Sequence, residues 1–420
     1  MNILFISEYF PPYDVGGAEI STSLIIKYIS NYSNCYILTE RYQKEPWIFN
    51  NSPVFPILKR IHMEQRSFVN ILKYGINVIL APLINIRVIV SFIKKYNIDI
   101  IHFVPTAYFF APLIFAAILT KKPFVIDIRN YSLVCPVSFT SKFCEDNNYI
   151  KHNYNCLRSN YAVNKKIFKI INPVFALYEY MVFYLHTKFL RLTLRSSVNY
   201  KIIPNSRFVQ DVLINNGYPR NKMQIIYNII NILPENKKEY VRENKIVYAG
   251  QIEKYKGIWD VVFAFDLLKD KNLSLVIAGN GREMNNLKKY IKDKKISNIV
   301  FTGKLSNEKI HDLYRESKII VAPSNYPEPF GRFILESIAV RTPLITTSTG
   351  GSPEGIKNRE TGMILEPNNP VGLAGAIKEL LSNDKLYQHI VNNLKKEENK
   401  YSPETIIQQR LGLYKSLLGE

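Results

Sequence analysis

The chain has 420 residues, 47% of them hydrophobic, and a formal net charge of +20. This length suits two domains that each bury a core, and the hydrophobic share excludes a disordered chain. The positive charge has two alternative explanations, a compositional bias toward Lys, Asn, Ile and Tyr, or binding to anionic partners. No run of five or six like charges occurs, so nucleic acid is not expected to be a partner.

No targeting or membrane-spanning segment is predicted. The opening Met-Asn-Ile-Leu-Phe-Ile-Ser-Glu has no basic region before its apolar run, unlike a secretory signal. Prolines interrupt the apolar stretch 103–119, and Asn and Arg interrupt 76–93, so neither is expected to cross a membrane. Four cysteines without a disulfide framework indicate a reducing compartment, and we expect a cytoplasmic protein.

The first half alternates predicted strands with helices. Residues 2–7 are predicted to be a strand and 17–29 a helix, with the glycine pair Gly16-Gly17 between them. Such a pair lets a ligand approach the helix start closely, and an ordinary turn is the alternative. The third glycine of a dinucleotide fingerprint is missing, so no nicotinamide site is expected. Further strands are predicted at 34–39, 99–104, 123–128, 201–206 and 224–229.

This alternation predicts a parallel sheet, in which ligands bind at the carboxyl ends of the strands. His102 falls near the end of its predicted strand, and Arg129-Asn130 directly follows another. These three residues are therefore candidates for an acceptor-side site. Because a guanidinium cannot act as a general base at neutral pH, Arg129 would clamp an anion. The alternatives are a core histidine at position 102 and a solvated surface arginine at position 129.

An irregular and helical insertion is expected at about 136–195. Cys135, Cys144 and Cys156 are separated by eight and eleven residues, unlike the close pairs of zinc ribbons. His152 offers a fourth ligand for a Cys₃His site, but this loose spacing favours buried thiols, and we expect no zinc.

Residues 165–195 form a predicted helical stretch that is dense in Phe and Tyr. Lys165, Lys166 and Lys169 lie on one flank and further basic residues on the other, against the single acid Glu179. The apolar centre, 173–185, is too short to span a bilayer, which takes roughly 20 residues. Basic flanks and tyrosines favour an anionic membrane surface, and burial against its own domain is the alternative.

The second half repeats strand and helix more regularly. A polar segment at 234–240 places the domain boundary near residue 235, which divides the chain into 1–235 and 236–400 with a final helix in 401–420. Ser352 is predicted as an N-cap with Pro353 and Glu354 in the first turn, and Ser402-Pro403 as the start of the final helix. Strands are predicted at 246–250, 273–279, 298–303, 319–323, 343–348 and 363–366.

Residues 322–336 read Ala-Pro-Ser-Asn-Tyr-Pro-Glu-Pro-Phe-Gly-Arg-Phe-Ile-Leu-Glu. Three prolines prevent regular structure until a helix begins near Gly331. Arg332 lies in the first turn of that helix, where the positive helix end disfavours a cation. Free N–H groups, a glycine and a basic side chain together predict an anion site. A simple Arg332–Glu336 pair, in the weaker i, i+4 order, is the alternative.

Glu328 and Glu336, with seven residues between them, precede a strand and Thr349-Gly350-Gly351-Ser352-Pro353-Glu354. This pattern resembles the retaining glycosyltransferases of the GT-B fold, specifically family 4 (glycosyl transferases group 1). The resemblance covers nearly the whole chain. It implies an α/β protein with two Rossmann-like, doubly wound parallel-sheet domains that face an interdomain cleft. The first domain would be the acceptor side, the second would bind the nucleotide sugar, and the final helix would cross back to the first.

The resemblance also implies roles for individual residues. Glu336 would hold the ribose hydroxyls and Glu328 the sugar hydroxyls. The catalytic residues would be Glu328, Lys256 and Arg332, because Lys256 and Arg332 neutralise the leaving diphosphate with the backbone of Phe330-Gly331. Gln251 stands where the family has an arginine, and Arg129-Asn130 stands where it commonly has His-Asp. The remaining donor-side positions are Gly16 and Gly17 over the phosphates and Gly279 and Gly303 around the base.

The implied activity is retaining transfer of a hexose-type sugar from a nucleotide-diphosphate sugar to a glycan or lipid-linked acceptor, in cell-surface polysaccharide or glycolipid biosynthesis. No Asp-x-Asp motif is present to hold a metal, so metal-independent chemistry without a cofactor is expected. No obligate protein partner is expected, and the enzyme would be peripheral at the inner face of the cell membrane. The alternatives are a nucleotide-sugar epimerase or hydrolase of the same fold, and a non-catalytic nucleotide-sugar-binding protein, which Gln251 and Arg129 motivate.

Overall fold

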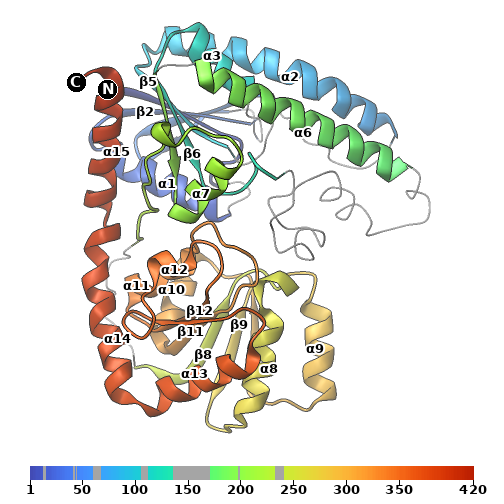
Figure 1. The fold of residues 1–420 in the computed structure, drawn as a ribbon, viewed down its shortest axis with the longest axis vertical. Helices are drawn as coiled ribbons and strands as arrows, with labels where there is room; N and C mark the ends of the chain where they lie inside the picture. The colour runs from blue at the N-terminus through green and yellow to red at the C-terminus, as the bar shows by residue number, and fades with distance from the viewer. Residues whose placement is uncertain are drawn as a thin grey trace. The chain divides into compact units, whose positions relative to one another are not determined.

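A computed structural model describes residues 1–12, 16–40, 43, 45–59, 68–105, 112–135, 171–196, 199–231 and 241–420 (Figure 1). The chain divides into two compact units. The first unit comprises Met1–Tyr227 together with Ile406–Glu420, and the second comprises Asn228–Thr405. The last residues of the sequence therefore belong to the same unit as the first residues.

The first unit is built on a seven-stranded sheet A with the order β3-β4-β2-β1-β5-β6-β7. All neighbouring strands pair in parallel except β3 and β4, which are antiparallel. β5 and β6 contain only buried residues, as expected where helices cover both faces of a parallel sheet. The strands are β1 (Asn2–Ser7), β2 (Asn34–Glu40), β3 (Trp47–Phe49), β4 (Ser52–Leu58), β5 (Ile100–Val104), β6 (Phe124–Ile128) and β7 (Tyr200–Pro204).

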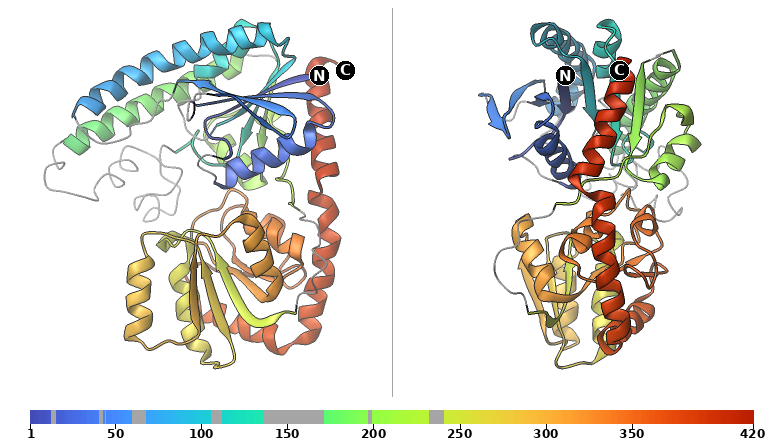
Figure 2. Two further views of the ribbon diagram at one scale, coloured as in Figure 1. Left: turned by 180° about the vertical axis from the view of Figure 1, so that it is seen from behind. Right: turned by 90° about the vertical axis from the view of Figure 1, so that its left-hand side faces the viewer.

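Three helices form one layer on sheet A and lie at the top of Figure 1. α2 (Phe68–Lys95) contacts α3 (Ile114–Leu119), and Phe115 of α3 stacks on Phe189 of α6 (Ile171–Ser196) with ring centroids 4.9 Å apart. α2 and α6 are the two long helices that Figure 2 shows from behind. Within the described residues, no helix combines the length and apolar character that crossing a membrane requires.

The other α-helices in the described part of the first unit are α1 (Gly17–Ile29), α7 (Arg207–Asn215) and most of α15 (Pro403–Leu418). α1 has the bounds expected from its apolar spacing, and Gly16 is its N-cap. Ser206 caps α7 by accepting a hydrogen bond from the N–H of Val209 at 3.1 Å. These caps explain why both helices begin directly after a strand or turn.

Two expectations for the first unit are wrong. Residues 224–229 do not form a strand, although they run beside β7 with a single bridge between Ile202 and Met223. Pro204 at the end of β7 has no N–H to donate, so the ladder cannot continue. Conversely, β4 was not predicted because Pro53 and Pro56 lie within its seven residues. Its parallel pairing with β2 nevertheless keeps it in the sheet.

The second unit contains the six-stranded, fully parallel sheet B, with the order β10-β9-β8-β11-β12-β13. Each strand lies within three residues of its predicted position. The strands are β8 (Glu243–Ala249), β9 (Ser274–Ala278), β10 (Ile299–Gly303), β11 (Ser317–Ala322), β12 (Leu344–Thr347) and β13 (Met363–Leu365). Its longer helices are α8 (Ile258–Leu268), α9 (Met284–Asp293), α10 (Asn307–Glu316), α11 (Arg332–Val340), α13 (Pro370–Ser382) and α14 (Asp384–Glu397).

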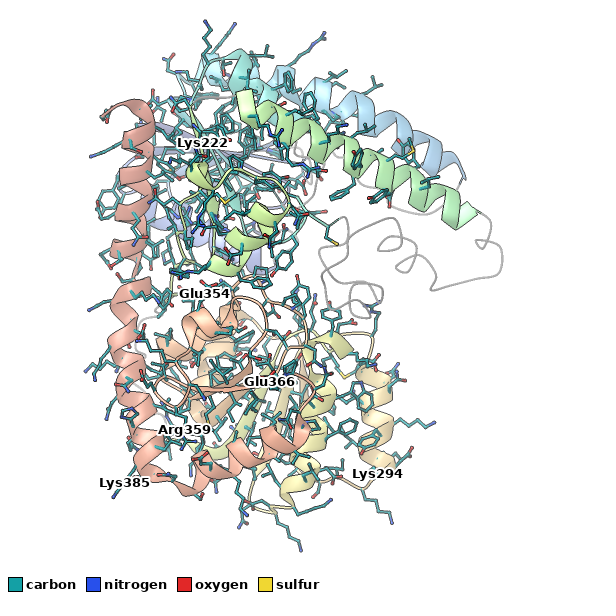
Figure 3. The ribbon with its side chains drawn as sticks, in the orientation of Figure 1. Lys222, Lys294, Glu354, Arg359, Glu366 and Lys385 are labelled. Carbon is teal, nitrogen blue, oxygen red and sulfur yellow. The ribbon has the colours of Figure 1, made fainter. Side chains whose placement is uncertain are left out.

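The short helix α12 (Ser352–Gly355) starts one residue earlier than predicted. Its N-cap is Gly351, and Ser352 is the first helical residue rather than the cap. The Gly351 N–H donates to the carbonyl of Glu328 at 2.7 Å, which ties the start of α12 to the loop after β11. The exposed side chains of Lys294 and Lys385 point outward from the unit (Figure 3).

Candidate functional site

Two ion pairs at the carboxyl edge of sheet B form the candidate site. Lys256 ends a short 3₁₀ turn, Lys254–Lys256, after β8, and Glu328 lies in the loop after β11. Lys256 Nζ lies 2.6 Å from Glu328 Oε1, although the two residues are 72 positions apart in the sequence. Their side chains are 21% and 13% exposed, so both remain accessible from solvent. The structure therefore brings together two of the three predicted catalytic residues.

Aromatic rings and a hydroxyl group fix this pair in place. Lys256 Nζ lies 4.6 Å from the ring centroid of Tyr326 and 5.6 Å from that of Tyr255, distances at which a cation is attracted to the ring face. Ser324 Oγ donates to Glu328 Oε1 at 3.2 Å. The sequence pattern did not single out Ser324 or the two tyrosines, although all three lie within or beside the predicted motifs.

The glycines of the Thr349-Gly350-Gly351 motif let this loop approach Glu328. Gly350 has a φ of +60°, and a Cβ at this position would lie 2.3 Å from the carbonyl oxygen of Glu328. No other residue type fits such a contact, because the backbone oxygen cannot move away. The motif therefore positions the backbone of Glu328, which explains in physical terms why the two features occur together.

Arg332 and Glu336 form the second pair. α11 starts at Arg332 with Gly331 as its N-cap, as predicted, and Arg332 Nη2 lies 3.2 Å from Glu336 Oε1. The i, i+4 pair is thus present, and it neutralises a cation at the positive end of the helix. Side-chain exposures of 16% and 15% leave both groups within reach of a ligand. The space beside Gly331 is taken by the Phe333 ring, which a Cβ would approach to 2.3 Å.

Two buried tyrosines lie behind the pairs. Burial raises the pKa of the Tyr248 phenol, and the charge of Glu328 raises it further. Burial likewise raises the pKa of Tyr314 well above its usual value, with a further contribution from Glu336. Tyr248 donates to the carbonyl of Gln251 at 2.7 Å, so this phenol supports the turn after β8. Neither tyrosine was predicted, because buried aromatic residues on strands and helices look like ordinary core.

Gln251 and the loop glycines have local structural roles. The Tyr255 hydroxyl donates to Gln251 Oε1 at 3.1 Å, and the Gln251 side chain is exposed at the surface. Gly279 has a φ of +142°, and a Cβ there would lie 1.8 Å from the carbonyl oxygen of Gly250. Close backbone packing at the strand exit is therefore sufficient to require Gly279. Gly303 also has a positive φ, +72°, but faces open space.

In the first unit, the structure corrects the expectation for His102. This side chain is fully buried, with Nε2 3.2 Å from Asp127 Oδ2 and Nδ1 2.5 Å from the Tyr414 hydroxyl. Burial lowers the pKa of His102 to about 4, so the ring is neutral near pH 7. A neutral ring donates to the carboxylate through Nε2 and accepts from Tyr414 through Nδ1. Both nitrogens are engaged inside the core, and no acceptor can reach them.

Arg129 is likewise not an anion clamp. Its guanidinium forms two hydrogen bonds with Asp127, at 2.7 and 3.3 Å, and donates to the Ala18 carbonyl at 3.2 Å. Arg129 is therefore neither a ligand-binding residue nor the solvated surface arginine of the alternative. Asn130 closes a turn by accepting from the Ser132 N–H at 3.0 Å and the Ser132 hydroxyl at 2.7 Å.

Asp127 is the centre of this buried network, which we call the Asp127 cluster: His102, Asp127, Arg129, Arg410 and Tyr414. Arg410 Nη1 lies 2.8 Å from Asp127 Oδ2, and both side chains are fully buried. Burial alone would raise the pKa of Asp127, but Arg129 and Arg410 outweigh it and hold this pKa well below the usual value. The cluster joins β5 and β6 to α15 within the first unit.

Gly16 and Gly17 open α1 as predicted. The Gly16 N–H donates to Glu19 Oε2 at 2.9 Å, so a carboxylate of the chain itself already occupies this helix end. A donor phosphate would have to displace Glu19.

Of the residues considered for zinc, Cys135 is a buried free thiol, and Cys144, His152 and Cys156 lie outside the described residues. Among the described residues, no group of three His, Cys, Asp or Glu side chains is placed to hold a metal.

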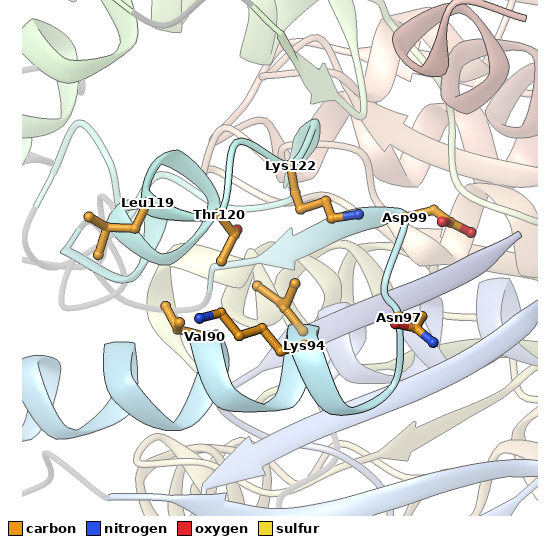
Figure 4. Close-up of a pocket in the computed structure, with 8 residues that line it drawn as sticks. Val90, Lys94, Asn97, Asp99, Leu119, Thr120 and Lys122 are labelled. Atoms are coloured by element: carbon orange, nitrogen blue, oxygen red, sulfur yellow. The ribbon is translucent and has the colours of Figure 1, made fainter.

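A hollow of about 410 Å³ lies elsewhere in the first unit (Figure 4). Its lining includes Lys94 and Asn97 at the end of α2 and Lys122 just before β6. This is the amino edge of sheet A, whereas parallel sheets bind substrates at the carboxyl edge. The hollow is therefore not the transfer site.

Part of the second unit is similar in sequence to known glycosyltransferases. Residues 230–397 match the family model described as "Glycosyl transferases group 1", and this stretch lies within the second unit. An uncharacterized glycosyltransferase of Methanocaldococcus jannaschii is 32% identical over 218 residues, which cover 47% of this chain and 55% of the relative. The matched stretch thus spans about half the length of that relative. The capsular polysaccharide biosynthesis glycosyltransferase CapM of Staphylococcus aureus is 26% identical over 261 residues, covering 58% of this chain and 67% of CapM.

The similarity of the fold extends over the whole chain. The crystal structure of HepE from Anabaena in complex with UDP-glucose superposes on this chain with a TM-score of 0.66 and a sequence identity of 18%. The match covers 99% of this chain and 100% of the HepE chain. At this identity the likeness establishes the fold. The protein therefore has a GT-B fold of two Rossmann-like parallel-sheet units, and residues 230–397 of its second unit match the glycosyl transferases group 1 family model.

Proposed function

We propose that the protein is a retaining glycosyltransferase of family 4 that uses a nucleotide-diphosphate hexose as donor. The observation that carries this proposal is the Lys256–Glu328 pair, 2.6 Å apart at the carboxyl edge of a parallel sheet. A cation and a carboxylate held together but accessible can separate to bind opposite parts of one substrate. The similarity of residues 230–397 to group 1 glycosyl transferases supports this assignment.

In this proposal the donor replaces the partner of each charged side chain in the two ion pairs. Lys256 and Arg332 turn toward the diphosphate, together with the N–H groups at Phe330-Gly331. Glu328 then accepts hydrogen bonds from the sugar hydroxyls, and Glu336 from the ribose. Gln251, Gly279 and Gly303 complete the donor side in the second unit.

The chemistry follows from where charge develops. Cleavage of the glycosidic C–O bond builds negative charge on the diphosphate and positive charge on the sugar ring. Fixed cations and a helix N-terminus near the phosphate stabilise the first charge, and this is the main catalytic contribution. Displacement on the same face retains the configuration at the anomeric carbon. Because these groups neutralise the diphosphate themselves, we propose that transfer needs no divalent metal.

The proposed acceptor is a glycan or a lipid-linked saccharide in the synthesis of a cell-surface polysaccharide or glycolipid, with the enzyme on the inner face of the cell membrane. The name of the CapM relative, which refers to capsular polysaccharide biosynthesis, supports this class of acceptor. It leaves the individual sugar open.

The test offers several nucleotide sugars, UDP-glucose among them, with a lipid extract and with soluble glycans. Mass spectrometry identifies the product, and proton NMR gives the configuration of the new anomeric centre. We expect transfer with retention that persists in a chelator. Turnover of the donor without any acceptor would instead identify an epimerase or hydrolase, and binding without turnover would identify a binding protein.

A further inference from the structure

The outer surface of the α2–α3–α6 layer is unusually apolar. Eighteen large hydrophobic side chains are exposed among the described residues, and eleven of them lie on these three helices. Monomeric proteins rarely expose contiguous apolar patches beyond about 600 Å², and larger ones mark interaction sites. We call these eleven side chains the apolar outer face: Leu80, Leu83 and Ile84 of α2, Ile118 and Leu119 of α3, and Leu177, Met181, Tyr184, Leu185, Phe189 and Leu192 of α6.

α6 is apolar on both sides, which an ordinary surface helix is not. Its inner stripe, with Phe183, Leu190 and Leu194, is buried against its own unit. Its outer stripe repeats Leu177, Met181 and Leu185 at helical spacing, with exposures of 49%, 54% and 57%. Burial against the domain therefore explains only half of the helix. The outer half has no such explanation.

The face is continuous from α6 to α2. Phe115 of α3 stacks on Phe189 of α6, and α3 contacts α2. On α2, Leu80, Leu83 and Ile84 continue into Arg87 and Lys94 along the same exposed stripe. Three helices of one layer thus contribute to a single surface.

The exposed charges on the described parts of these three helices are of one sign, and Asp99 is a nearby carboxylate just after α2. Among the described side chains of these helices, Glu179 is the sole carboxylate, and it is buried at 8% exposure. The exposed charged groups on or directly after the three helices are Arg87, Lys94, Lys95, Lys121, Lys188 and Arg195. Most of these cations lie toward the C-terminal ends of their helices. The hollow of Figure 4 is lined by Lys122 and by Leu119, which is 64% exposed, and also by Asp99.

We propose that the apolar outer face docks on an anionic lipid bilayer, with its leucines and aromatic rings in the boundary between headgroups and acyl chains. The cations at the helix ends would contact lipid phosphates, since basic groups are attracted to anionic leaflets. A protein partner would need a surface complementary in shape and charge to three helices whose described parts expose basic and apolar side chains but no acidic ones. An anionic leaflet is complementary in charge and apolar character and needs no particular shape. Docking would bring the enzyme to a lipid-linked acceptor, and this role rests on the proposed function. Docking itself is measured without any sugar transfer.

The experiment is flotation of the purified full chain with vesicles of phosphatidylcholine alone or with one third phosphatidylglycerol, without any nucleotide sugar. We expect binding to the anionic vesicles, and binding that weakens as salt screens the charges. Met181→Glu combined with Leu185→Glu removes apolar contacts, and Lys94→Glu combined with Lys188→Glu reverses two cations. Each pair should lower partitioning by at least about tenfold.

Matched controls come from exposed positions of the second unit. Leu267→Glu with Val371→Glu, and Lys294→Glu with Lys385→Glu, make the same changes and should leave partitioning within about twofold of wild type. Far-UV circular dichroism and the unfolding midpoint verify that each variant is folded. The proposal is wrong if wild type remains unbound at low salt, or if the folded outer-face variants float like the controls. It is also wrong if sedimentation shows a wild-type dimer that the outer-face variants convert to monomer, because the face would then bind a second copy.

Discussion

The Asp127 cluster and the pairs at the edge of sheet B use the same groups, carboxylates with arginine or lysine, in opposite environments. The side chains of Asp127 and Arg410 are fully buried, and that of Arg129 is 2% exposed. In contrast, the Lys256, Glu328, Arg332 and Glu336 side chains are 13–21% exposed. The first arrangement leaves no room for a ligand. The second holds charges that a substrate can reach.

This difference shows how to distinguish a structural charge from a functional one. Removing one partner of a buried pair leaves an uncompensated charge away from water, which is strongly destabilising. Removing one partner of a pair that is partly exposed leaves a charge that water can reach and solvate, so the fold should tolerate the change better. Substitutions in the two regions should therefore affect different measurements, stability in one and transfer in the other.

The largest expected effect is that of Asp127→Asn. The amide keeps the size of the side chain but leaves Arg129 and Arg410 without a counter-charge. Loss of one partner of a buried pair lowers the free energy of unfolding by about 3–5 kcal/mol. Urea denaturation measures this change, with Glu328→Gln as the matched control at the edge of sheet B. Equal midpoints for the two variants would remove the distinction between the regions.

Lys256→Ala and Glu336→Ala should give the reverse pattern. Loss of one charged contact to the diphosphate or the ribose should raise the transition-state barrier by about 2–4 kcal/mol, a fall of roughly 10²–10³ in kcat/KM. The unfolding midpoint should change little. Lys254→Ala is the control, because Lys254 lies in the same turn and is exposed. Turnover near wild type in either site variant would disprove the proposed donor site.

Acid should destabilise the first region in a defined pH window. Burial lowers the pKa of His102 from 6.5 to about 4, so the unfolded state binds a proton in this range and the folded state does not. The contribution of His102 to stability is therefore constant above pH 6.5, falls by about 3–4 kcal/mol between pH 6.5 and 4, and levels off below. The lowered pKa of Asp127 adds a further loss as the pH falls below the usual aspartate range. Burial lowers the pKa of His186 in the same direction.

Unfolding midpoints measured across this pH range check the titration. In His102→Gln the unfolding midpoint should depend less on pH, because the contribution of His102 is removed. This expectation holds whether or not the substitution changes stability at neutral pH. His186→Gln, measured in parallel, gives the share of the second histidine. An unchanged slope in His102→Gln would mean that this ring is not held neutral by its burial.

The smallest effect is expected for Gln251→Arg. The hydrogen bond from Tyr255 to Gln251 is at an exposed position, so its loss should change stability little. An arginine would restore a charge-assisted donor at the diphosphate and tighten donor binding, by about 1 kcal/mol or fivefold in Kd. Calorimetric titration with the donor measures this difference. Weaker binding in the variant would show that Gln251 has a partner of its own in the complex.

The strands of sheet B were predictable from the sequence because their signals are local. Lys256, Glu328 and Glu336 were singled out through the family resemblance instead, and the pairing of Lys256 with Glu328 was not predicted. Apolar runs mark the strands, and prolines and glycines mark the turns at which Lys256 and Glu328 lie. The environment of His102 was not predictable in this way. Its partners Asp127 and Tyr414 lie 25 and 312 positions away, and no local periodicity connects them. Likewise, β4 was not predicted because its two prolines are a local signal against a strand. Pairing with β2 overrides this signal in the folded unit.

The place of Arg410 and Tyr414 in the Asp127 cluster also affects the order in which the chain can fold during synthesis. Domains generally fold as their sequence emerges from the ribosome, the N-terminal one first. Here the first unit lacks two residues of its buried cluster until translation reaches Tyr414, whereas the second unit ends at Thr405. The unit that begins later is thus the first to have its complete sequence, and the nascent first unit lacks the contacts of Arg410 with Asp127 and of Tyr414 with His102 until the last helix is made.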